Sequence, residues 1–421
     1  MPSYTRFTNC NLIDNGQVYE NTDLYINNST NKICHPPANS SDITRTIDIH
    51  GNFISPGFLD IQNNGIYGLS FSALNAKSTP EDIAHFDRFY KDAMTKYLST
   101  GVTATCPTLP STFPETYKKV LPFYKKSRTS TQTDSLGAHI EGPFISAEKK
   151  GCHPVETFVD AKEGESKLYD IYGGEANLVD NVCILTAAPE IPGVLDLIPI
   201  IKSKNIVFSL GHTMADYKTA VKAVDNGATM VTHLYNAMPQ PHHRDAGVVG
   251  LINSPEVGDE KTPYFGLIVD GVHVDPSMVN LAYRSNPDKC VLVTDAMHLI
   301  GLPDGTYKWD DQFIVKTGDR LYLKGTKTLA GASTTLPHCV RNLMKWSKAS
   351  LAEAVKTVTN NAAVSIGVEH QRGFLNVGCD ADLVVLNKAG FVQKVYKLGR
   401  EIKSSDIEDF SANEGKIMAV L

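Results

Sequence analysis

The middle of the chain alternates short runs of apolar residues with segments of helical periodicity. Eight such runs could form buried strands, and they are Ile54–Leu59, Val102–Thr105, Leu136–Ile140, Val182–Thr186, Ile206–Leu210, Met230–Thr232, Phe265–Val269 and Val291–Thr294. The clearest helix starts at Thr79-Pro80, keeps apolar residues on one face through Tyr97, and ends at Gly101. Strands that alternate with helices predict a (β/α)8 TIM-like barrel. A doubly wound open sheet is the alternative, but no strand is followed by the GxGxxG turn of a dinucleotide site.

The two ends of the chain have a different pattern. Residues 1–52 consist of short strand-like runs, such as Phe7–Leu12 and Thr44–Ile49, separated by turn signals. Similar runs return near the other end, at Gly373–Leu375, Ala381–Leu386, Phe391–Leu398 and Glu401-Ile402, after a helical pattern from Leu351 to Val364. We therefore expect residues 1–52 and 373–421 to form one small β-sandwich domain, and residues 53–372 to form the barrel.

Two histidines occupy equivalent places in the segment Ile206–Met238. One apolar run ends at His212, a helix-like stretch follows and stops at Gly227, and a second apolar run ends at His233. Parallel strands joined by a helix point the same way, so both imidazoles would emerge at the carboxyl ends of the strands. They could bind a metal ion or be core histidines satisfied by hydrogen bonds, and the pattern leaves both open.

Acidic residues follow two other predicted strands. Glu141 ends the third strand and Asp295 ends the eighth, and barrel enzymes carry their chemistry at this end. Glu141, His212 and His233 offer one oxygen and two nitrogens, a set suited to a catalytic zinc with one position open for water. Asp295 would then exchange protons with the reactants. Glu141 could instead be a solvated loop carboxylate and Asp295 a helix cap, whereas His139 is expected to pack below the metal without binding it.

Composition narrows the class of protein. The 421 residues, 42% hydrophobic and 20% charged, are typical of a globular enzyme or scaffold larger than one small domain. A net charge of −6 without long Lys/Arg runs argues against a nucleic-acid partner, and no apolar window approaches the length of a membrane span. The eight cysteines show no CxxC spacing, which predicts reduced thiols in a cytoplasmic protein and no cysteine-ligated zinc.

Nine short motifs extend over nearly the whole chain, and they are Pro56–Asp60, His139-Ile140-Glu141-Gly142-Pro143, Lys150-Gly151-Cys152-His153, Gly211-His212-Thr213, Thr232–Met238, Asp270-Gly271-Val272-His273, Thr294-Asp295-Ala296, Leu329-Ala330-Gly331 and the glycine-rich pattern from Gly373 to Leu383. In these motifs the chain resembles the N-acetylglucosamine-6-phosphate deacetylase family of the metal-dependent amidohydrolase superfamily. Each motif alone is weak, but their number and order are specific. The resemblance implies hydrolysis of N-acetyl-D-glucosamine 6-phosphate to D-glucosamine 6-phosphate and acetate, in amino-sugar catabolism.

The resemblance also assigns roles to individual residues. It implies Glu141, His212 and His233 as metal ligands and Asp295 as the catalytic acid and base. The substrate-binding residues that it implies are Cys152, His153, Asn236, Ala237, Arg244, His273, Leu329, Ala330 and Gly331. In the family, the arginine matching Arg244 reaches the substrate phosphate from the neighbouring subunit, so the resemblance implies a homodimer. It gives no role to His298.

One departure from the superfamily pattern bears on the metal. The first barrel strand of the superfamily usually ends in His-x-His, which holds a second metal, but Gln62 and Asn64 stand at those positions here. Neutral amides are poor ligands for transition metals. We therefore expect one divalent ion per subunit, with zinc as the first candidate and iron, manganese and cobalt as alternatives.

Two other functions remain open at this point. The chain could be another metal-dependent amidohydrolase acting on a cyclic amide, which would have no need for the phosphate-binding set of Asn236, Ala237 and Arg244. It could also be a non-catalytic barrel scaffold, although such a scaffold would have no need for three metal ligands and an acid/base aspartate.

Overall fold

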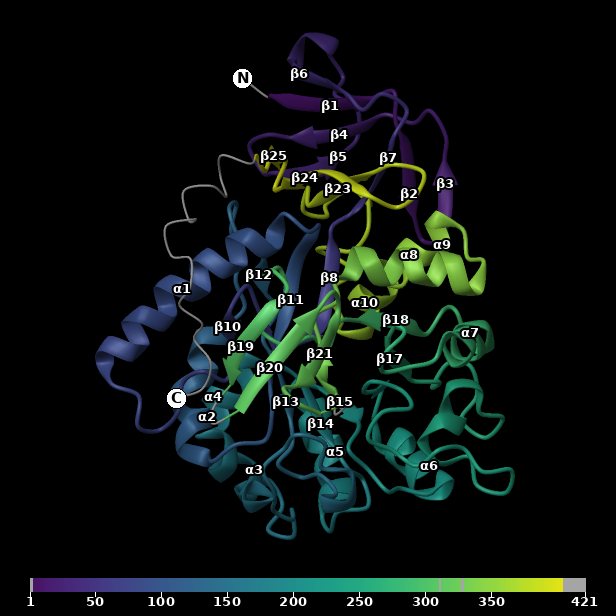
Figure 1. Ribbon diagram of the computed structural model, residues 1–421. Coiled ribbons are helices and arrows are strands. Elements are labelled where there is room, and N and C mark those ends of the chain that lie inside the picture. Colours follow the sequence, from purple (N-terminus) through teal and green to yellow (C-terminus); the bar gives the residue numbers. More distant parts are fainter. Residues whose placement is uncertain (1–2, 310–311, 327–328, 404–421) are drawn as a thin grey trace.

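Eight parallel strands surround the centre of the molecule in this computed structural model, which describes residues 3–309, 312–326 and 329–403 (Figure 1). They are β8 (Phe58–Asn63), β11 (Val102–Leu109), β13 (Ala138–Glu141), β14 (Val182–Ala187), β15 (Val207–Leu210), β16 (Met230–Val231), β17 (Tyr264–Ile268) and β18 (Cys290–Val293). Each pairs with the next in chain order, and the Asp295 amide donates to the Gln62 carbonyl (2.9 Å), which links the last strand to the first. The predicted barrel is confirmed.

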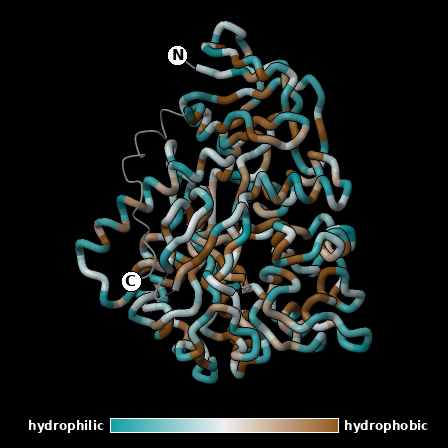
Figure 2. Tube along the Cα trace, in the orientation of Figure 1, coloured by the Kyte–Doolittle hydropathy of each residue, from teal (hydrophilic) through white to brown (hydrophobic). Residues whose placement is uncertain are grey.

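Helices cover the outside of this barrel. They are α1 (Pro80–Leu98), α2 (Pro114–Val120), α3 (Glu165–Tyr172), α4 (Glu175–Asn181), α5 (Val194–Ser203), α6 (Tyr217–Asn226), α7 (Pro276–Ser285) and α8 (Leu336–Ser347). Helix α1 begins as predicted, because Thr79 and Asp82 cap it reciprocally and Pro80 occupies its first turn. Figure 2 shows hydrophobic and hydrophilic stretches alternating along α1, as in an amphipathic helix that packs one face on the barrel.

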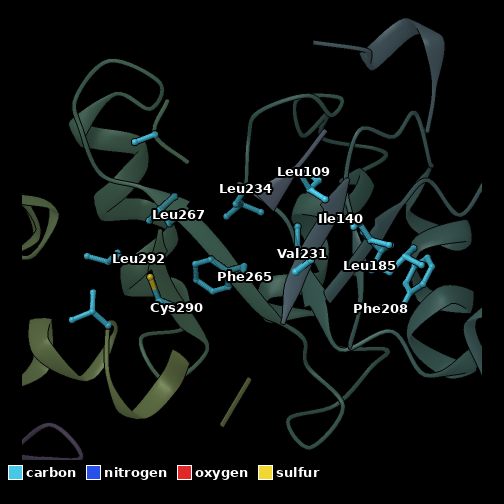
Figure 3. Close-up of a cluster of buried hydrophobic side chains, with 14 of the residues drawn as sticks. Leu109, Ile140, Leu185, Phe208, Val231, Leu234, Phe265, Leu267, Cys290 and Leu292 are labelled. Atoms are coloured by element: carbon cyan, nitrogen blue, oxygen red, sulfur yellow. The ribbon is translucent and has the colours of Figure 1, made fainter. Parts of the chain in front are cut away.

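The barrel strands place alternate side chains in two separate layers. Outward-facing residues such as Ile140, Leu185 and Phe208 pack under the helices in one large hydrophobic cluster, part of which Figure 3 shows. A separate cluster that includes Ile184 and Met230 fills the barrel interior. Since Ile140 points outward, the next residue on β13, Glu141, points inward, where it is buried at the carboxyl end of the strand.

The two ends of the chain share one of the two sheets that lie above the barrel. One sheet has the order β25-β24-β23-β7-β2-β3 and another has the order β5-β4-β1-β6; Figure 1 shows the purple N-terminal and yellow C-terminal strands together above the barrel. The N-terminal strands are β1 (Tyr4–Thr8), β2 (Asn11–Asp14), β3 (Gln17–Tyr19), β4 (Leu24–Asn27), β5 (Lys32–Cys34), β6 (Ile43–Asp48) and β7 (Phe53–Pro56), and the C-terminal ones are β23 (Leu383–Leu386), β24 (Val392–Lys397) and β25 (Arg400–Glu401). Residues from both ends share one core.

The structure divides the first predicted strand, Ile54–Leu59, between these two parts. Strand β7 pairs with β23 and β2 in the terminal sheet, whereas β8 pairs with β11 in the barrel. The change occurs at Gly57, where a Cβ atom would lie 2.1 Å from Oγ1 of Thr103, so no larger residue fits this close approach. We therefore propose a domain boundary at Gly57 and not at residue 52; residues 404–421 of the predicted terminal domain lie outside the described residues.

Two further predictions of secondary structure are wrong. The expected helix Leu351–Val364 is two helices, α9 (Leu351–Lys356) and α10 (Asn360–Ser365). Between them the carbonyls of Thr357 and Val358 accept hydrogen bonds from barrel residues Leu292 (3.3 Å) and Leu59 (2.8 Å), so tertiary bonds replace the helical ones. The expected strand Gly373–Leu375 is an irregular bend.

An antiparallel sheet that the sequence pattern did not predict follows β18. Its strands are β19 (Gly305–Trp309), β20 (Gln312–Thr317), β21 (Arg320–Leu323) and β22 (Leu329–Ala332), and Figure 1 shows β19–β21 in front of the barrel. The Met297 amide donates to the Ala332 carbonyl (2.9 Å), which holds β22 against the segment after Asp295. A short hairpin of β9 (Gly65–Ile66) and β10 (Leu69–Ser70) lies on the other side of that segment. Both elements bound the mouth of the barrel.

The described helices include none that is both long and apolar enough to cross a membrane. All eight cysteines lie in the described part of the chain, and none forms a disulfide there.

A buried ionic group joins the terminal sheet to the barrel. Nζ of Lys397, on β24, donates to carboxylate oxygens of Asp134 (2.7 Å) and Asp382 (2.6 Å), and Arg372 donates to Asp134 (3.0 Å). All four side chains are buried. Such a group adds little net stability when complete, but the loss of one member leaves uncompensated charge in a medium of low dielectric constant.

We expect Lys397→Met to destabilise the protein by about 3–5 kcal/mol, because it leaves the buried carboxylate of Asp382 without its cation and Asp134 with Arg372 alone. The matched control is Lys91→Met, which breaks an exposed pair with Asp87 and should cost no more than about 1 kcal/mol. Urea unfolding of both variants measures the difference. Equal losses of unfolding free energy in the two variants would contradict the interpretation.

Candidate active site

A cavity of about 610 Å³ opens at the carboxyl ends of the barrel strands. Eleven of the thirteen predicted site residues line it, and they are Glu141, Cys152, His153, His212, His233, Asn236, Ala237, His273, Asp295, Ala330 and Gly331. The other two, Arg244 and Leu329, are not among the residues that line it. The fold thus brings together most of a set whose members are spread over 191 positions, from residue 141 to residue 331.

Three of these side chains converge at the centre of the barrel mouth. Glu141 ends β13, His212 follows β15 and His233 follows β16, and one ligand atom from each lies within 4.8 Å of the others. Oε2 of Glu141 is 3.4 Å from Nε2 of His212, which is 3.1 Å from Nε2 of His233. The backbone turns sharply after each strand, since φ is +50° at His212 and +29° at His233. Such strained backbone is concentrated at functional sites.

The chemistry of this set fits a divalent cation. Nδ1 of His212 lies 2.8 Å from the Lys149 carbonyl, which can only accept a hydrogen bond, so a neutral His212 presents the lone pair of Nε2 toward Glu141 and His233. Nδ1 of His233 is buried and has no hydrogen-bond partner among the described residues. Three electron-pair donors that face one another at these distances need a cation between them.

Gln62 and Asn64, the two amides at the end of β8, each hold a carboxylate of the site. Nε2 of Gln62 donates to Oε1 of Glu141 (2.5 Å), and Nδ2 of Asn64 donates to Oδ1 of Asp295 (2.8 Å). This contact gives a physical role to the two residues that replace the His-x-His motif. They orient the carboxylates from positions where histidines would hold a second metal.

The two carboxylates have opposite protonation tendencies. Burial opposes ionisation of Glu141, but the hydrogen bond from His153 and the neighbouring imidazoles of His212 and His233 outweigh it and hold the pKa of Glu141 well below its usual range. Burial and the neighbouring charge of Glu141 raise the pKa of Asp295 to about 7, against the opposing effects of His273 and Asn64. One carboxylate is therefore a permanent anion, while the other is suited to exchange a proton near neutral pH.

His153 is fixed in one tautomer beside Glu141. The Ser111 amide donates to Nδ1 of His153 (3.0 Å), so in the neutral ring the proton is on Nε2, 3.4 Å from Oε2 of Glu141. Burial is the main cause that lowers the pKa of His153 and keeps it neutral. His153 therefore lies at the edge of the proposed metal centre as a hydrogen-bond donor, close enough to contact both Glu141 and a substrate in the cavity.

His273 forms a hydrogen-bonded pair with Asp270. Nδ1 of His273 is 2.7 Å from Oδ2 of Asp270, whose other oxygen accepts from the amides of Val272 and His273. Burial lowers the pKa of His273, but the hydrogen bond and charge of Asp270 outweigh that effect and raise it above the usual value. The pair keeps a positively polarised imidazole at the cavity wall.

Asn236 and Ala237, in the turn after His233, were predicted to bind phosphate. The structure shows that their two backbone amides differ. The Asn236 amide already donates to the His233 carbonyl (2.9 Å). The Ala237 amide has no hydrogen bond among the described residues, and its residue has φ of +51°. The lining of the cavity contains no Lys or Arg, and Arg244 is exposed in the loop beyond the turn.

Two histidines outside the metal set, His139 and His298, differ in their hydrogen bonding. His139 is satisfied, with Nδ1 3.0 Å from the Ile61 carbonyl and Nε2 2.7 Å from Oγ1 of Thr186, as expected for a residue packed below the ligands. His298 also lines the cavity, but its Nε2 is buried without a partner among the described residues. Burial lowers the pKa of His298 to about 4. Sequence reasoning gave it no role, because a histidine after an aspartate carries no motif.

Comparison with known proteins agrees with this geometry. The family model for the amidohydrolase family matches residues 53–402. An N-acetylglucosamine-6-phosphate deacetylase from Danio rerio is 36% identical over 406 residues, which cover 94% of this chain and 96% of the relative. The corresponding human enzyme is also 36% identical, over 95% of this chain and 96% of its own.

A solved structure shows the same similarity. The crystal structure of N-acetylglucosamine-6-phosphate deacetylase from Pasteurella multocida has a TM-score of 0.78 and 29% identity, and the match covers 94% of this chain and 99% of that one. A mutant of the Mycobacterium smegmatis deacetylase was solved in complex with N-acetyl-D-glucosamine-6-phosphate, and it matches with a TM-score of 0.76 and 25% identity over 95% of this chain and 99% of its own.

The low pKa of His298 predicts how stability depends on pH in the metal-free protein. His298 is neutral in the fold, with a pKa of about 4, while an unfolded histidine titrates near about 6.5. The unfolded state therefore binds more protons between these values, and the free energy of unfolding falls as the pH drops below about 6.5. We expect His298→Leu to remove this effect, so that its stability relative to wild type improves by about 2 kcal/mol between pH 7 and pH 5.

Urea unfolding at pH 7, 6 and 5 in the presence of a chelator measures this difference. Parallel profiles for the wild type and His298→Leu would mean that His298 is not held neutral by burial.

Proposed function

Because the chain belongs to the amidohydrolase family and, within it, to the N-acetylglucosamine-6-phosphate deacetylases, we propose that it hydrolyses N-acetyl-D-glucosamine 6-phosphate to D-glucosamine 6-phosphate and acetate. The observation that carries the proposal is the convergence of Glu141, His212 and His233 beside Asp295 in one cavity. Amide hydrolysis needs an activated water, a group that accepts its proton and returns it to the leaving amine, and a means of polarising the carbonyl.

Glu141, His212 and His233 would hold one divalent ion per subunit, with zinc as the first candidate for a donor set of two nitrogens and one oxygen. When bound there, such an ion supplies Lewis acidity and lowers the pKa of a coordinated water to roughly 7. A second ion is not expected, because the amides of Gln62 and Asn64 are already engaged with the two carboxylates.

Asp295 would carry the proton through the reaction. Its pKa of about 7 lets it accept a proton from the attacking water as the C–O bond forms. It then returns that proton to the amide nitrogen as the C–N bond breaks, so the amine leaves neutral and Asp295 is again ionised. Asn64 holds the carboxyl in place, and the polarised imidazole of His273 would donate a hydrogen bond to the carbonyl oxygen as negative charge develops there.

The other predicted contacts surround the sugar. We propose that Cys152 and His153 contact it from the loop after β13, and that Ala330 and Gly331 cover it from β22. A Cβ atom on Gly331 would lie 2.6 Å from the sulfur of Met297, so a larger residue there would push β22 away from the cavity. Leu329 would act indirectly by anchoring β22 to β21.

The phosphate would bind at the turn containing Asn236 and Ala237, with Arg244 supplied by a second subunit. A phosphate dianion needs cationic or amide donors. The cavity offers the free Ala237 amide but no Lys or Arg of its own. The guanidinium of Arg244 is exposed and forms no ion pair among the described residues, so it is available to a neighbouring subunit.

Exposed hydrophobic side chains at the barrel mouth support a homodimer. Phe113, Val155 and Met214 are 50%, 49% and 38% exposed. They lie two residues beyond Ser111, His153 and His212 respectively, so they mark the rim around the site. An apolar rim of this kind is typical of a surface that another chain covers. We also propose a cytoplasmic enzyme, which its unpaired cysteines favour.

The two alternatives are less well supported. A hydrolase of cyclic amides would have no need for Arg244 and the free amide at Ala237, and the similarity to deacetylases covers nearly the whole chain. A non-catalytic scaffold would have no need for the pKa of Asp295 to be near neutrality or for three convergent ligands.

We expect the metal-loaded protein to release acetate rapidly from N-acetylglucosamine 6-phosphate and slowly from N-acetylglucosamine. Arg244→Leu should raise KM for the phosphorylated sugar by about 10–100-fold, because a charge-assisted contact with phosphate is lost. The matched control, Arg88→Leu on the exposed face of α1, should leave KM unchanged. Equal turnover of both sugars, or an unchanged KM in Arg244→Leu, would remove the phosphate assignment.

A mixture of two impaired variants, assayed at a substrate concentration below the wild-type KM, tests whether Arg244 acts in trans. Subunits of Arg244→Leu retain Asp295, and subunits of Asp295→Asn retain Arg244, so a hybrid dimer contains one complete site only if the arginine crosses the interface. We expect refolded mixtures to recover activity well above either parent. Activity no greater than the average of the parents would place Arg244 in its own subunit's site.

Asp295→Asn should lower kcat by about 10²–10⁴-fold, since the amide cannot accept and return a proton. Its bound metal, measured by mass spectrometry, should equal that of wild type because Asp295 is outside the proposed ligand set. Glu141→Gln should instead lose the metal together with the activity. Loss of metal in Asp295→Asn, or retention in Glu141→Gln, would reverse the two roles.

A further inference from the structure

His298 is a cavity residue whose imidazole lacks a partner. It lies between β18 and β19, is 2% exposed, and lines the same cavity as Glu141 and Asp295. Its Nε2 atom is fully buried and accepts or donates no hydrogen bond among the described residues. A buried polar atom left without a partner costs about 1–3 kcal/mol and is rare in native proteins.

The other histidines of the cavity show how unusual this is. His153, His212 and His273 each have a hydrogen bond at Nδ1, to Ser111, Lys149 and Asp270 respectively. Among the described residues one other buried imidazole nitrogen lacks a partner, Nδ1 of His233, whose Nε2 faces the proposed metal centre. His233 belongs to the proposed metal set, so His298 is the unsatisfied histidine of the cavity to which the metal assigns no role.

The backbone holds His298 firmly in this position. Its carbonyl accepts from the Gly68 amide (2.7 Å), and the preceding Met297 amide donates to Ala332 (2.9 Å), so the segment is fixed on both sides. A Cβ atom on Gly65 would lie 2.9 Å from both Cα and Cβ of His298, which means that the hairpin leaves room for this side chain only because residue 65 is glycine. Gly65 pairs with Ser70, which also lines the cavity.

The ring is neutral, and this limits what it can bind. Burial lowers the pKa of His298 to about 4, so at neutral pH it offers one donor and one acceptor and no charge. A phosphate group would prefer amide and guanidinium donors, such as those of Ala237 and Arg244. An uncharged hydroxyl group, which both donates and accepts, matches a neutral imidazole.

We propose that His298 contacts the substrate and forms a hydrogen bond with an uncharged hydroxyl group of the bound amino sugar. This inference rests on the proposed function. It explains why an imidazole is kept at a place where an apolar side chain would make the free protein more stable. It also identifies the β9–β10 hairpin as part of the wall that selects the substrate.

The test compares the wild type, His298→Leu and His298→Gln with N-acetylglucosamine 6-phosphate and with its 1-, 3- and 4-deoxy analogues. His298→Leu should lower kcat/KM for the parent sugar by about tenfold, the value of one neutral hydrogen bond, mainly through KM. For the one analogue that lacks the contacted hydroxyl, wild type and variant should differ by less than twofold. His298→Gln, which keeps a polar atom near the position of Nε2, should recover part of the loss.

The melting temperature of the substrate-free proteins separates the two roles, because a purely structural role of His298 predicts a lower melting temperature in His298→Leu. Here His298→Leu should melt at the wild-type temperature or above, because it removes an unsatisfied polar atom. A lower melting temperature with a proportional loss on every analogue would show a structural role and overturn the proposal. An unchanged kcat/KM in His298→Leu would also overturn it.

The outcomes separate this inference from the proposed function. If wild type fails to turn over the phosphorylated sugar, the deacetylase function fails and the inference fails with it. If wild type is active and His298→Leu is equally active on all analogues, the function stands and only the role of His298 is lost.

Discussion

The site depends on placing two carboxylates close together, out of water, at the mouth of one barrel. Two buried anions repel each other, so they cannot both ionise freely. The structure resolves this by making their surroundings unequal. Glu141 is surrounded by imidazoles and accepts a hydrogen bond from Gln62, whereas burial and the charge of Glu141 oppose ionisation of Asp295 more than His273, Asn64 and His212 favour it. The difference in pKa separates an anionic metal ligand from a proton carrier.

Much of this arrangement could be predicted from sequence, because it depends on chain direction. Parallel strands that alternate with helices place every strand end on one face, so Glu141, His212, His233 and Asp295 had to meet there. Seven of the eight barrel strands agree with their own apolar runs to within four residues at each end, and the first run is the exception because it is divided between β7 and β8. The three residues predicted to bind the metal and the predicted acid/base residue lie together in the structure.

Other features could not be predicted, since they depend on contacts between distant segments. The break between α9 and α10 arises from carbonyls that bond to β8 and β18, and no local signal marks it. The division of the first strand at Gly57 reflects the close approach of Thr103. The strands of the four-stranded sheet after β18 are too short for a pattern of alternating apolar and polar residues to be recognised in the sequence. Likewise, the roles of Gln62 and Asn64 became clear only when their carboxylate partners were located.

The residues at the site share a physical character that the sequence does not reveal. At His212, His233 and Asp295 the backbone has positive φ, and at His233 and His298 a buried nitrogen lacks a partner. Each feature disfavours the free protein, and each lies at the same cavity. A stable fold tolerates such defects where a bound species relieves them, so strained backbone and a buried unsatisfied nitrogen in the lining of one cavity indicate a functional role independently of any motif. By this argument His298 belongs with the functional residues, although it has neither the spacing nor the neighbours of a recognisable signature.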